Sequence, residues 1–194
     1  GTVISETLLP DANNNFLAVL YEEADCLVLG AADISTGECI WAQAAGPNRM
    51  NAICDHLIRL LPSELLIVGK ISDLSLLKNF LASRLPNCLC SPFSIDDIEK
   101  IRQLPRQHFE DLPDNHLCLT VIGCLLHYLH TTLKADLSHL NRLTEYTAND
   151  YLILDAATLR NLEITRNIRD GSKKDTLFSI LDFTQTAMGT RLLK

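Results

Sequence analysis

The chain has 194 residues, of which 47% are hydrophobic and 21% are charged, and its formal net charge is −7. This composition is typical of a folded globular protein and excludes an intrinsically disordered one. Because non-specific affinity for DNA depends on clustered Lys and Arg, the acidic balance argues against a surface that grips phosphates on its own. The seven cysteines show no CxxC spacing, and neither a signal peptide nor an apolar run of about 18 residues is present. These features predict reduced thiols in a cytoplasmic protein without a membrane span.

The first part of the chain predicts a linker followed by strands. Residues 1–14 contain turn formers and few apolar residues, so we expect a linker there. Apolar runs follow at 16–21, 26–34 and 38–44, and short connections join them. Short connections that contain Gly are typical of β-hairpins. The sequence therefore predicts a meander of three antiparallel strands.

Helices and single strands alternate in the next part of the chain. Three segments carry apolar residues at helical spacing, each ends near a proline, and they follow Asn48, Ser72 and Ser94. Runs at 65–69 and 88–90 predict strands between these helices. A meander followed by βαβ units is the order of ribonuclease-H-like domains. We therefore expect a ribonuclease-H-like α/β domain over residues 15–105.

The remaining sequence predicts a second, helical domain. Residues 106–115 lie in a stretch with prolines and mixed charges, which indicates a connection between domains. We expect a long helix from Val121 to Leu133, an irregular stretch at 137–149, a short strand at 151–154 and helices after Asp155 and Asp175. Residues 116–194 thus form a partial all-α domain. The last helix is expected to follow Asp175 and to carry an apolar stripe from Leu177 to Leu192. Since no cap closes this stripe, we expect the chain to be a piece of a longer protein.

The turn Asp33–Glu38, with the sequence DISTGE, is the strongest candidate for chemistry. In ribonuclease-H-like nucleases, carboxylates on the strands hold two divalent metal ions for phosphodiester cleavage. In the sugar-kinase and actin group, an Asp followed by small hydroxyl and Gly residues wraps a nucleotide phosphate. A nuclease needs further acidic residues on adjacent strands, and the run 16–20 has none. A plain hairpin turn is therefore the favoured interpretation.

Three other patterns carry weaker signals. Cys124, His127 and His130 share part of a helix face and could bind Zn²⁺, but no carboxylate completes the set, which favours histidines at the edge of a buried face. The pair Gly69–Lys70 is followed by Ile71 instead of Ser or Thr, so it is not a Walker A motif.

A basic cluster consists of Arg166, Arg169, Lys173 and Lys174. Such a run is usually a solvated loop, and a phosphate contact is the alternative.

Two longer motifs lie near the end of the chain. The first, D-x-x-T-x-x-N-L-E, contains Asp155, Thr158, Asn161 and Glu163. The second, L-D-x-T-x-T-x-M-G-x-R-x-L, contains Asp182, Thr184, Thr186, Gly189 and Arg191. Together they resemble the start of the core domain in the MutS family of DNA mismatch-repair proteins. The turn residues Asp33, Ser35, Thr36, Gly37 and Glu38 resemble the hairpin of the connector domain in the same family.

The resemblance implies a ribonuclease-H-like connector domain followed by the beginning of a lever-like, all-α core. It implies structural roles for the motif residues and no catalytic residue, cofactor or metal ligand in this chain. ATP and Mg²⁺ would bind elsewhere in the full-length ATPase. The implied partners are mismatched double-stranded DNA through the full-length protein, MutL, and a second copy in a homodimer, without a membrane. The implied location is the cytoplasm, at the bacterial nucleoid when the protein acts.

The resemblance also implies a role, which is to couple mismatch binding to the ATP state. Two alternatives stay open. One is a metal-dependent nuclease or phosphotransferase centred on Asp33. The other is a member of the MutS superfamily with another role.

Overall fold

The computed structural model describes residues 16–133, 137–146, 158, 161–186, 189–190 and 193. The chain divides into two compact units, one formed by residues 14–146 and the other by residues 1–13 together with 147–194. The linker expected at 1–14 and the strand expected at 151–154 lie outside the described residues. No described helix has both the length and the hydropathy that crossing a membrane requires.

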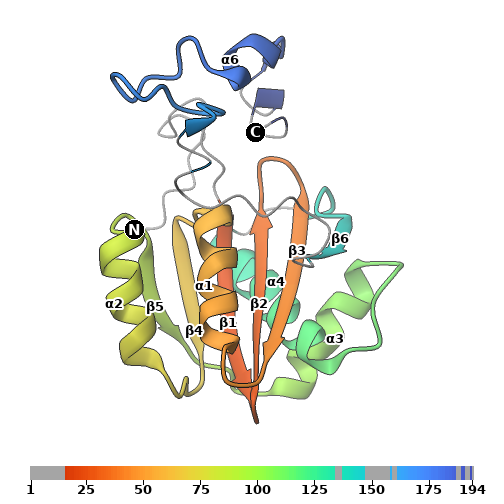
Figure 1. Ribbon diagram of the computed structural model, residues 1–194. Helices are drawn as coiled ribbons and strands as arrows, with labels where there is room; N and C mark the ends of the chain where they lie inside the picture. Colours follow the sequence, from red (N-terminus) through yellow and green to blue (C-terminus); the bar gives the residue numbers. More distant parts are fainter. Residues whose placement is uncertain are drawn as a thin grey trace. The chain divides into compact units, whose positions relative to one another are not determined.

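A six-stranded mixed sheet forms the centre of the unit 14–146, which we call the α/β unit (Figure 1). Its strands are β1 (Phe16–Glu23), β2 (Cys26–Asp33), β3 (Glu38–Ala45), β4 (Glu64–Val68), β5 (Leu89–Phe93) and β6 (Arg142–Glu145). They lie in the order β5-β4-β1-β2-β3-β6. β1, β2 and β3 form the predicted antiparallel meander, while β4 and β5 run parallel to β1 and β6 runs parallel to β3.

Helices cover both faces of this sheet, as Figure 1 shows. α1 (Arg49–Leu60) and α2 (Leu74–Arg84) lie on one face, and α3 (Ile98–His108) and α4 (His116–Leu133) lie on the other. Alternate residues of β1 enter two cores: Leu17 and Val19 pack with α3 and α4, whereas Ala18 and Leu20 pack with α1 and α2. Burial on both faces explains why these strands are continuously apolar in the sequence.

The position of α4 corrects the predicted domain boundary. We expected a connection at 106–115 and a second domain from residue 116, but α4 packs on β1 and β2 and belongs to the α/β unit. Its apolar residues, among them Val121 and Leu125, complete the core on their side of the sheet. Gly30 of β2 makes room for them, since a Cβ there would lie 3.0 Å from a Val121 methyl group. The leucine-rich sequence of α4 indicates that the helix is buried, but it does not indicate whether a sheet or other helices cover it.

Two further details of the α/β unit differ from expectation. α3 was predicted to end near Pro105 but continues to His108. Proline costs a helix the hydrogen bond of its missing N–H, and the helix tolerates that loss here. The stretch 137–149 was predicted to be irregular, yet residues 142–145 form β6 beside β3.

The second unit contains α6 (Leu177–Leu181). The sequence predicted a helix from Asp175 to Leu192, and this prediction is wrong, because α6 ends after five residues. Thr176 caps the helix: its hydroxyl accepts the Ser179 amide, and the Ser179 hydroxyl accepts the Thr176 amide. Thr158 and Asn161 are helical, as expected for the helix after Asp155. Asp155 itself lies outside the described residues.

Candidate functional site

The turn between β2 and β3 brings together the motif residues Asp33, Ser35, Thr36, Gly37 and Glu38. Asp33 is fully buried, and its Oδ1 accepts the Ser35 amide at 2.8 Å and the Ser35 hydroxyl at 2.6 Å. Gly37 has a φ of +77°, a conformation that glycine adopts without strain, and its amide donates to the Asp33 carbonyl at 2.9 Å. The Asp33 carboxylate therefore builds the turn by bonding the backbone two residues on.

The electrostatics of this turn involve two carboxyl groups. Asp33 and Glu38 are cross-strand partners in the β2–β3 ladder. Burial raises the pKa of Glu38, the Asp33 carboxylate raises it further, and Arg142 on β6 opposes both effects. Among the described residues, Asp33 Oδ2 and Thr36 Oγ1 are buried without a hydrogen-bond partner. A metal-dependent nuclease needs more carboxylates than this pair, and within the described ranges no group of three or more His, Cys, Asp or Glu residues is placed to hold a metal ion.

Two glutamates lie at the carboxyl end of β1. The sequence does not mark them as functional residues, because there they look like part of a hairpin turn. Glu22 is paired with Arg49 of α1 at 3.2 Å. Glu23 lies 2.8 Å from His116 of α4 and 3.9 Å from Arg102 of α3. This edge of an α/β sheet is the usual place for ligands. Here the two carboxylates instead connect β1 to helices on both faces of the sheet.

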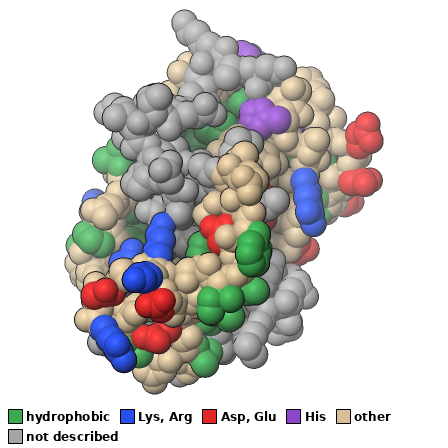
Figure 2. Space-filling model, turned by 90° about the horizontal axis from the view of Figure 1, so that it is seen from above, with side chains coloured by type: hydrophobic (Ala, Val, Ile, Leu, Met, Phe, Trp, Pro, Cys, Tyr) green, Lys and Arg blue, Asp and Glu red, His purple; other side chains and the backbone are tan. Residues whose placement is uncertain are grey.

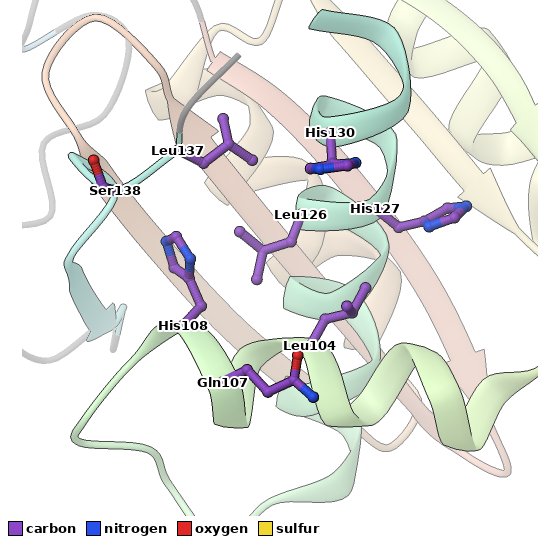
Figure 3. A pocket seen from close by; sticks show the side chains of 8 residues that line it. All are labelled: Leu104, Gln107, His108, Leu126, His127, His130, Leu137 and Ser138. Atoms are coloured by element: carbon purple, nitrogen blue, oxygen red, sulfur yellow. The ribbon is translucent and has the colours of Figure 1, made fainter. Parts of the chain in front are cut away.

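The predicted trio Cys124, His127 and His130 does not converge. Both histidines line a pocket of about 500 Å³, whereas Cys124 is fully buried in the core. Figure 3 shows the two imidazole rings pointing in different directions from successive turns of α4. Burial also raises the pKa of the Cys124 thiol to about 12, which opposes the thiolate that a metal would need. The complete lining consists of Leu104, Gln107, His108, Leu126, His127, His130, Leu137 and Ser138.

The basic residues Arg166, Arg169, Lys173 and Lys174 are all exposed. Their loop is shaped by its own hydrogen bonds: Glu163 Oε1 accepts the Ile168 amide at 2.7 Å, and the Gly171 amide donates to the Asn167 carbonyl at 2.9 Å. On the face drawn in Figure 2, Lys and Arg side chains of the described residues alternate with Asp and Glu side chains. This face is mixed in charge, which is typical of a solvated surface.

The second motif near the chain end forms a compact set of turns. Asp182 Oδ1 accepts the Thr184 amide at 3.1 Å and the Thr184 hydroxyl at 2.5 Å, which ends α6. Thr186 Oγ1 accepts the Gly189 amide at 3.1 Å, as an N-cap does. The Thr184 and Thr190 hydroxyls lie 2.6 Å apart. A Cβ at Gly189 would lie 3.1 Å from Thr184 Cβ, so glycine allows this close approach.

The structure describes only part of the first motif. Glu163 has a φ of +47°, and its carbonyl accepts the Leu177 amide at 3.3 Å, so it connects the loop to the start of α6. The Leu162 amide donates to the Thr158 carbonyl at 2.9 Å. Asp155 and, from the second motif, Arg191 lie outside the described residues. The described motif residues make backbone turns and caps.

Comparison with known proteins relates both units to one family. Residues 15–141 match the family model for MutS domain II, and residues 157–194 match the model for MutS domain III. The chain is 38% identical over 210 residues to the DNA mismatch repair protein MutS of Trichormus variabilis and 34% identical over 205 residues to that of Alkaliphilus oremlandii. Each alignment covers 100% of this chain but 24% and 23% of the relative, so the chain spans about a quarter of the length of the curated relatives it matches.

A solved structure, the nuclease domain of the large terminase subunit gp2 of bacterial virus Sf6, is 11% identical with a TM-score of 0.34. The superposition covers 94% of this chain and 87% of that one. This likeness is too distant to bear on function.

Proposed function

The chain belongs to the MutS family of DNA mismatch-repair proteins, and we propose that it forms the connector and the start of the lever in a mismatch-sensing ATPase. The observation that carries this proposal is the pair of matches, to MutS domain II and then domain III, which together cover most of the chain. Its role is to couple mismatch binding at one end of the longer protein to the ATP state at the other.

The topology of the α/β unit supports a ribonuclease-H-like assignment for the connector. β3-β2-β1-β4-β5 are neighbours in that order, and among the described strands β2 alone runs against the rest. The chain order of a meander followed by βαβ units agrees with this class. The sheet, covered on both faces, is a stiff body, which suits a part that transmits displacement.

We assign no catalytic step to this chain. The Asp33 carboxylate is engaged in a turn, and those of Glu22 and Glu23 form ion pairs with Arg49 and Arg102. The Gly69–Lys70 pair does not fit a phosphate loop, because buried Ile71 occupies the place of the hydroxyl that would contact Mg²⁺. We propose that ATP and Mg²⁺ bind other parts of the longer protein, and that mismatched DNA and the homodimer partner also contact other parts. We propose that MutL binds the surface of this chain. The proposed location of the protein is the cytoplasm.

Titration of the chain with ATP and with a mismatched duplex tests the non-catalytic role. We expect no tight binding of either ligand, and tight binding of either would contradict the proposal. Purified MutL should be retained on the immobilised chain and lost when the chain is unfolded in urea. Equal retention by the folded and the unfolded chain would remove MutL as a specific partner.

An assay for nucleic-acid cleavage distinguishes the non-catalytic role from the alternative of a nuclease centred on Asp33. The chain should not cleave DNA or RNA in the presence of Mg²⁺. Cleavage that is abolished by Asp33→Asn would establish the enzyme instead.

A further inference from the structure

Residues 137–146 form the segment that leads, in chain order, from α4 to the second unit, and we call it the exit segment. Although it was expected to be irregular, it follows one edge of the α/β unit and contains β6. It is anchored in three places, and each anchor joins residues far apart in the sequence.

The first anchor is the DISTGE turn. His139 Nε2 donates to the Ile34 carbonyl at 2.8 Å. The His139 carbonyl in turn lies so close to Gly37 that a Cβ at position 37 would overlap it. Leu140, next in the chain, is fully buried, and its carbonyl accepts His108 Nε2 at 2.7 Å. The turn therefore serves as the surface on which the beginning of the exit segment rests.

The second anchor is the edge of the sheet. β6 pairs with β3 in parallel, with Arg142 opposite Glu38 and Glu145 opposite Trp41. Burial and Asp33 raise the pKa of Glu38 overall, and Arg142 opposes this rise because its guanidinium favours the ionised carboxylate. The last residue of the DISTGE motif thus faces the exit segment as well.

The third anchor is Tyr146, where the α/β unit ends. Its amide donates to the Trp41 carbonyl at 2.7 Å, and its hydroxyl accepts Arg59 Nη1 at 3.1 Å. The His56 ring contacts the tyrosine ring edge to face, with centroids 5.0 Å apart. Arg59 and His56 belong to α1, so Tyr146 ties the end of the exit segment to the opposite helical layer.

We propose that the DISTGE turn is the docking socket of the exit segment, and that Gly37, His139 and Tyr146 are positioning residues that fix where the chain leaves the α/β unit. This explains why the turn needs a buried Asp33 to shape it and a glycine at position 37 to admit the His139 carbonyl. The proposal deepens the coupling role and rests on it: a docked exit transmits a displacement, whereas a slack linker absorbs it.

Hydrogen exchange of the chain, read by mass spectrometry, tests the docking directly. Amides of residues 142–146 should be protected to a degree comparable with β3. Gly37→Ala and His139→Ala should each speed their exchange by roughly tenfold or more, while β1 and β4 keep their protection. His139→Gln, which retains an N–H donor, should restore part of the protection.

Gly46→Ala is the matched control for Gly37→Ala. Gly46 lies just beyond β3, has a φ of +81° and has nothing within 4 Å of a built Cβ, so it imposes the backbone strain without the clash. His116→Ala, which removes the contact of another exposed histidine, is the control for His139→Ala. Neither control should change exchange in the exit segment.

Two results would overturn the docking: exchange of residues 142–146 at the rate of an unstructured peptide, or an equal effect of His139→Ala on the whole sheet. If Gly37→Ala does not fold, the exchange rates of the His139→Ala and His139→Gln variants test the docking of the exit segment. Because this experiment contains neither ATP nor DNA, its outcome is independent of the binding titrations that test the proposed function.

Discussion

The carbonyl oxygen of Ile101 in α3 faces Gly123 in α4 so closely that a Cβ at position 123 would overlap it. Pro105, four residues after Ile101, has no N–H to bond this carbonyl. The two helices therefore meet where one has a carbonyl without its usual helical donor and the other has no side chain. This contact helps to hold α4 in the α/β unit.

Gly123→Ala should lower the free energy of unfolding by about 1–3 kcal/mol, because the added methyl group forces the two helices apart. In a helix without this contact, the same change would be stabilising by about 1 kcal/mol. Urea unfolding, followed by the fluorescence of the single, buried Trp41, measures the difference. Ser75→Ala, on the exposed side of α2, is the control and should change little. A variant as stable as the parent would contradict the close contact.

The buried thiols predict instability at alkaline pH. Burial raises the pKa of Cys124 to about 12; burial, with the nearby carboxylates of Glu38 and Glu145 respectively, does the same for Cys39 and Cys118. A thiol whose folded pKa lies above its unfolded value of 9.0 favours folding at lower pH, and that contribution is lost as the pH rises toward the folded value. At pH 10 each such thiol should lower the free energy of unfolding by about 1 kcal/mol.

Unfolding in urea between pH 7.5 and pH 10.5 measures this loss. Replacing Cys124 by Ala should flatten the pH dependence, although it also removes packing at all pH values. Cys39, Cys118 and Cys124 should react slowly with a thiol reagent at pH 8 in the folded chain and quickly once it is unfolded. Rapid reaction of Cys39, Cys118 and Cys124 in the folded chain would contradict the prediction.

The Glu22–Arg49 pair predicts the opposite dependence on the acid side. Burial by itself would raise the pKa of Glu22, but hydrogen bonds from the Ser72 amide and from Arg49 lower it overall. A lowered pKa gives stability that is present above the unfolded value of 4.5 and is lost as the pH falls. Arg49→Met should destabilise the chain by about 1–3 kcal/mol at pH 7.

A double-mutant cycle with Glu22→Gln isolates the pair. The loss should be smaller at pH 4 than at pH 7, because at pH 4, below the unfolded value of 4.5, part of the free energy that the ionised Glu22 contributes to folding is already lost. A coupling energy that is the same at both pH values would show that Arg49 acts through packing alone.

Asp33 offers a test that separates a structural carboxylate from a catalytic one. Asp33→Ala should cost about 1–2 kcal/mol, since the Ser35 amide and hydroxyl lose their acceptor. Asp33→Asn keeps an oxygen acceptor and removes a negative charge beside Glu38, so it should be tolerated far better. Equal destabilisation by both changes in thermal unfolding would contradict the turn-building role.

The elements predicted well from the sequence are those whose burial is visible in the chain itself. The runs 16–21 and 65–69 became β1 and β4 because a strand covered on both faces has only apolar residues. By contrast, β6 is a four-residue edge strand with exposed Arg142 and Glu145, so it carries no such run. Its pairing depends on the docking of the exit segment, which is a tertiary effect.

The sequence pattern identified the motif residues, but it did not predict which turns, caps and contacts they form. The boundary at 106–115 failed because the apolar face of α4 fits a helical domain as well as a sheet. The long last helix failed because the Asp182 side chain competes for the backbone of Thr184. Gly37 gave only a turn signal, since its contact with His139 joins segments about a hundred residues apart in the chain.

We propose that this chain is an exchangeable, non-catalytic coupling part of a MutS protein. The most direct measurement is the mutation rate of a bacterium that lacks MutS and carries the Alkaliphilus oremlandii protein with its matching quarter replaced by this chain. We predict a rate close to that given by the unaltered relative, and a higher rate when the same chimera carries Gly37→Ala but not Gly46→Ala. A chimera that is expressed and folded, yet leaves the mutation rate at the level of the MutS-deficient strain, would contradict this coupling role.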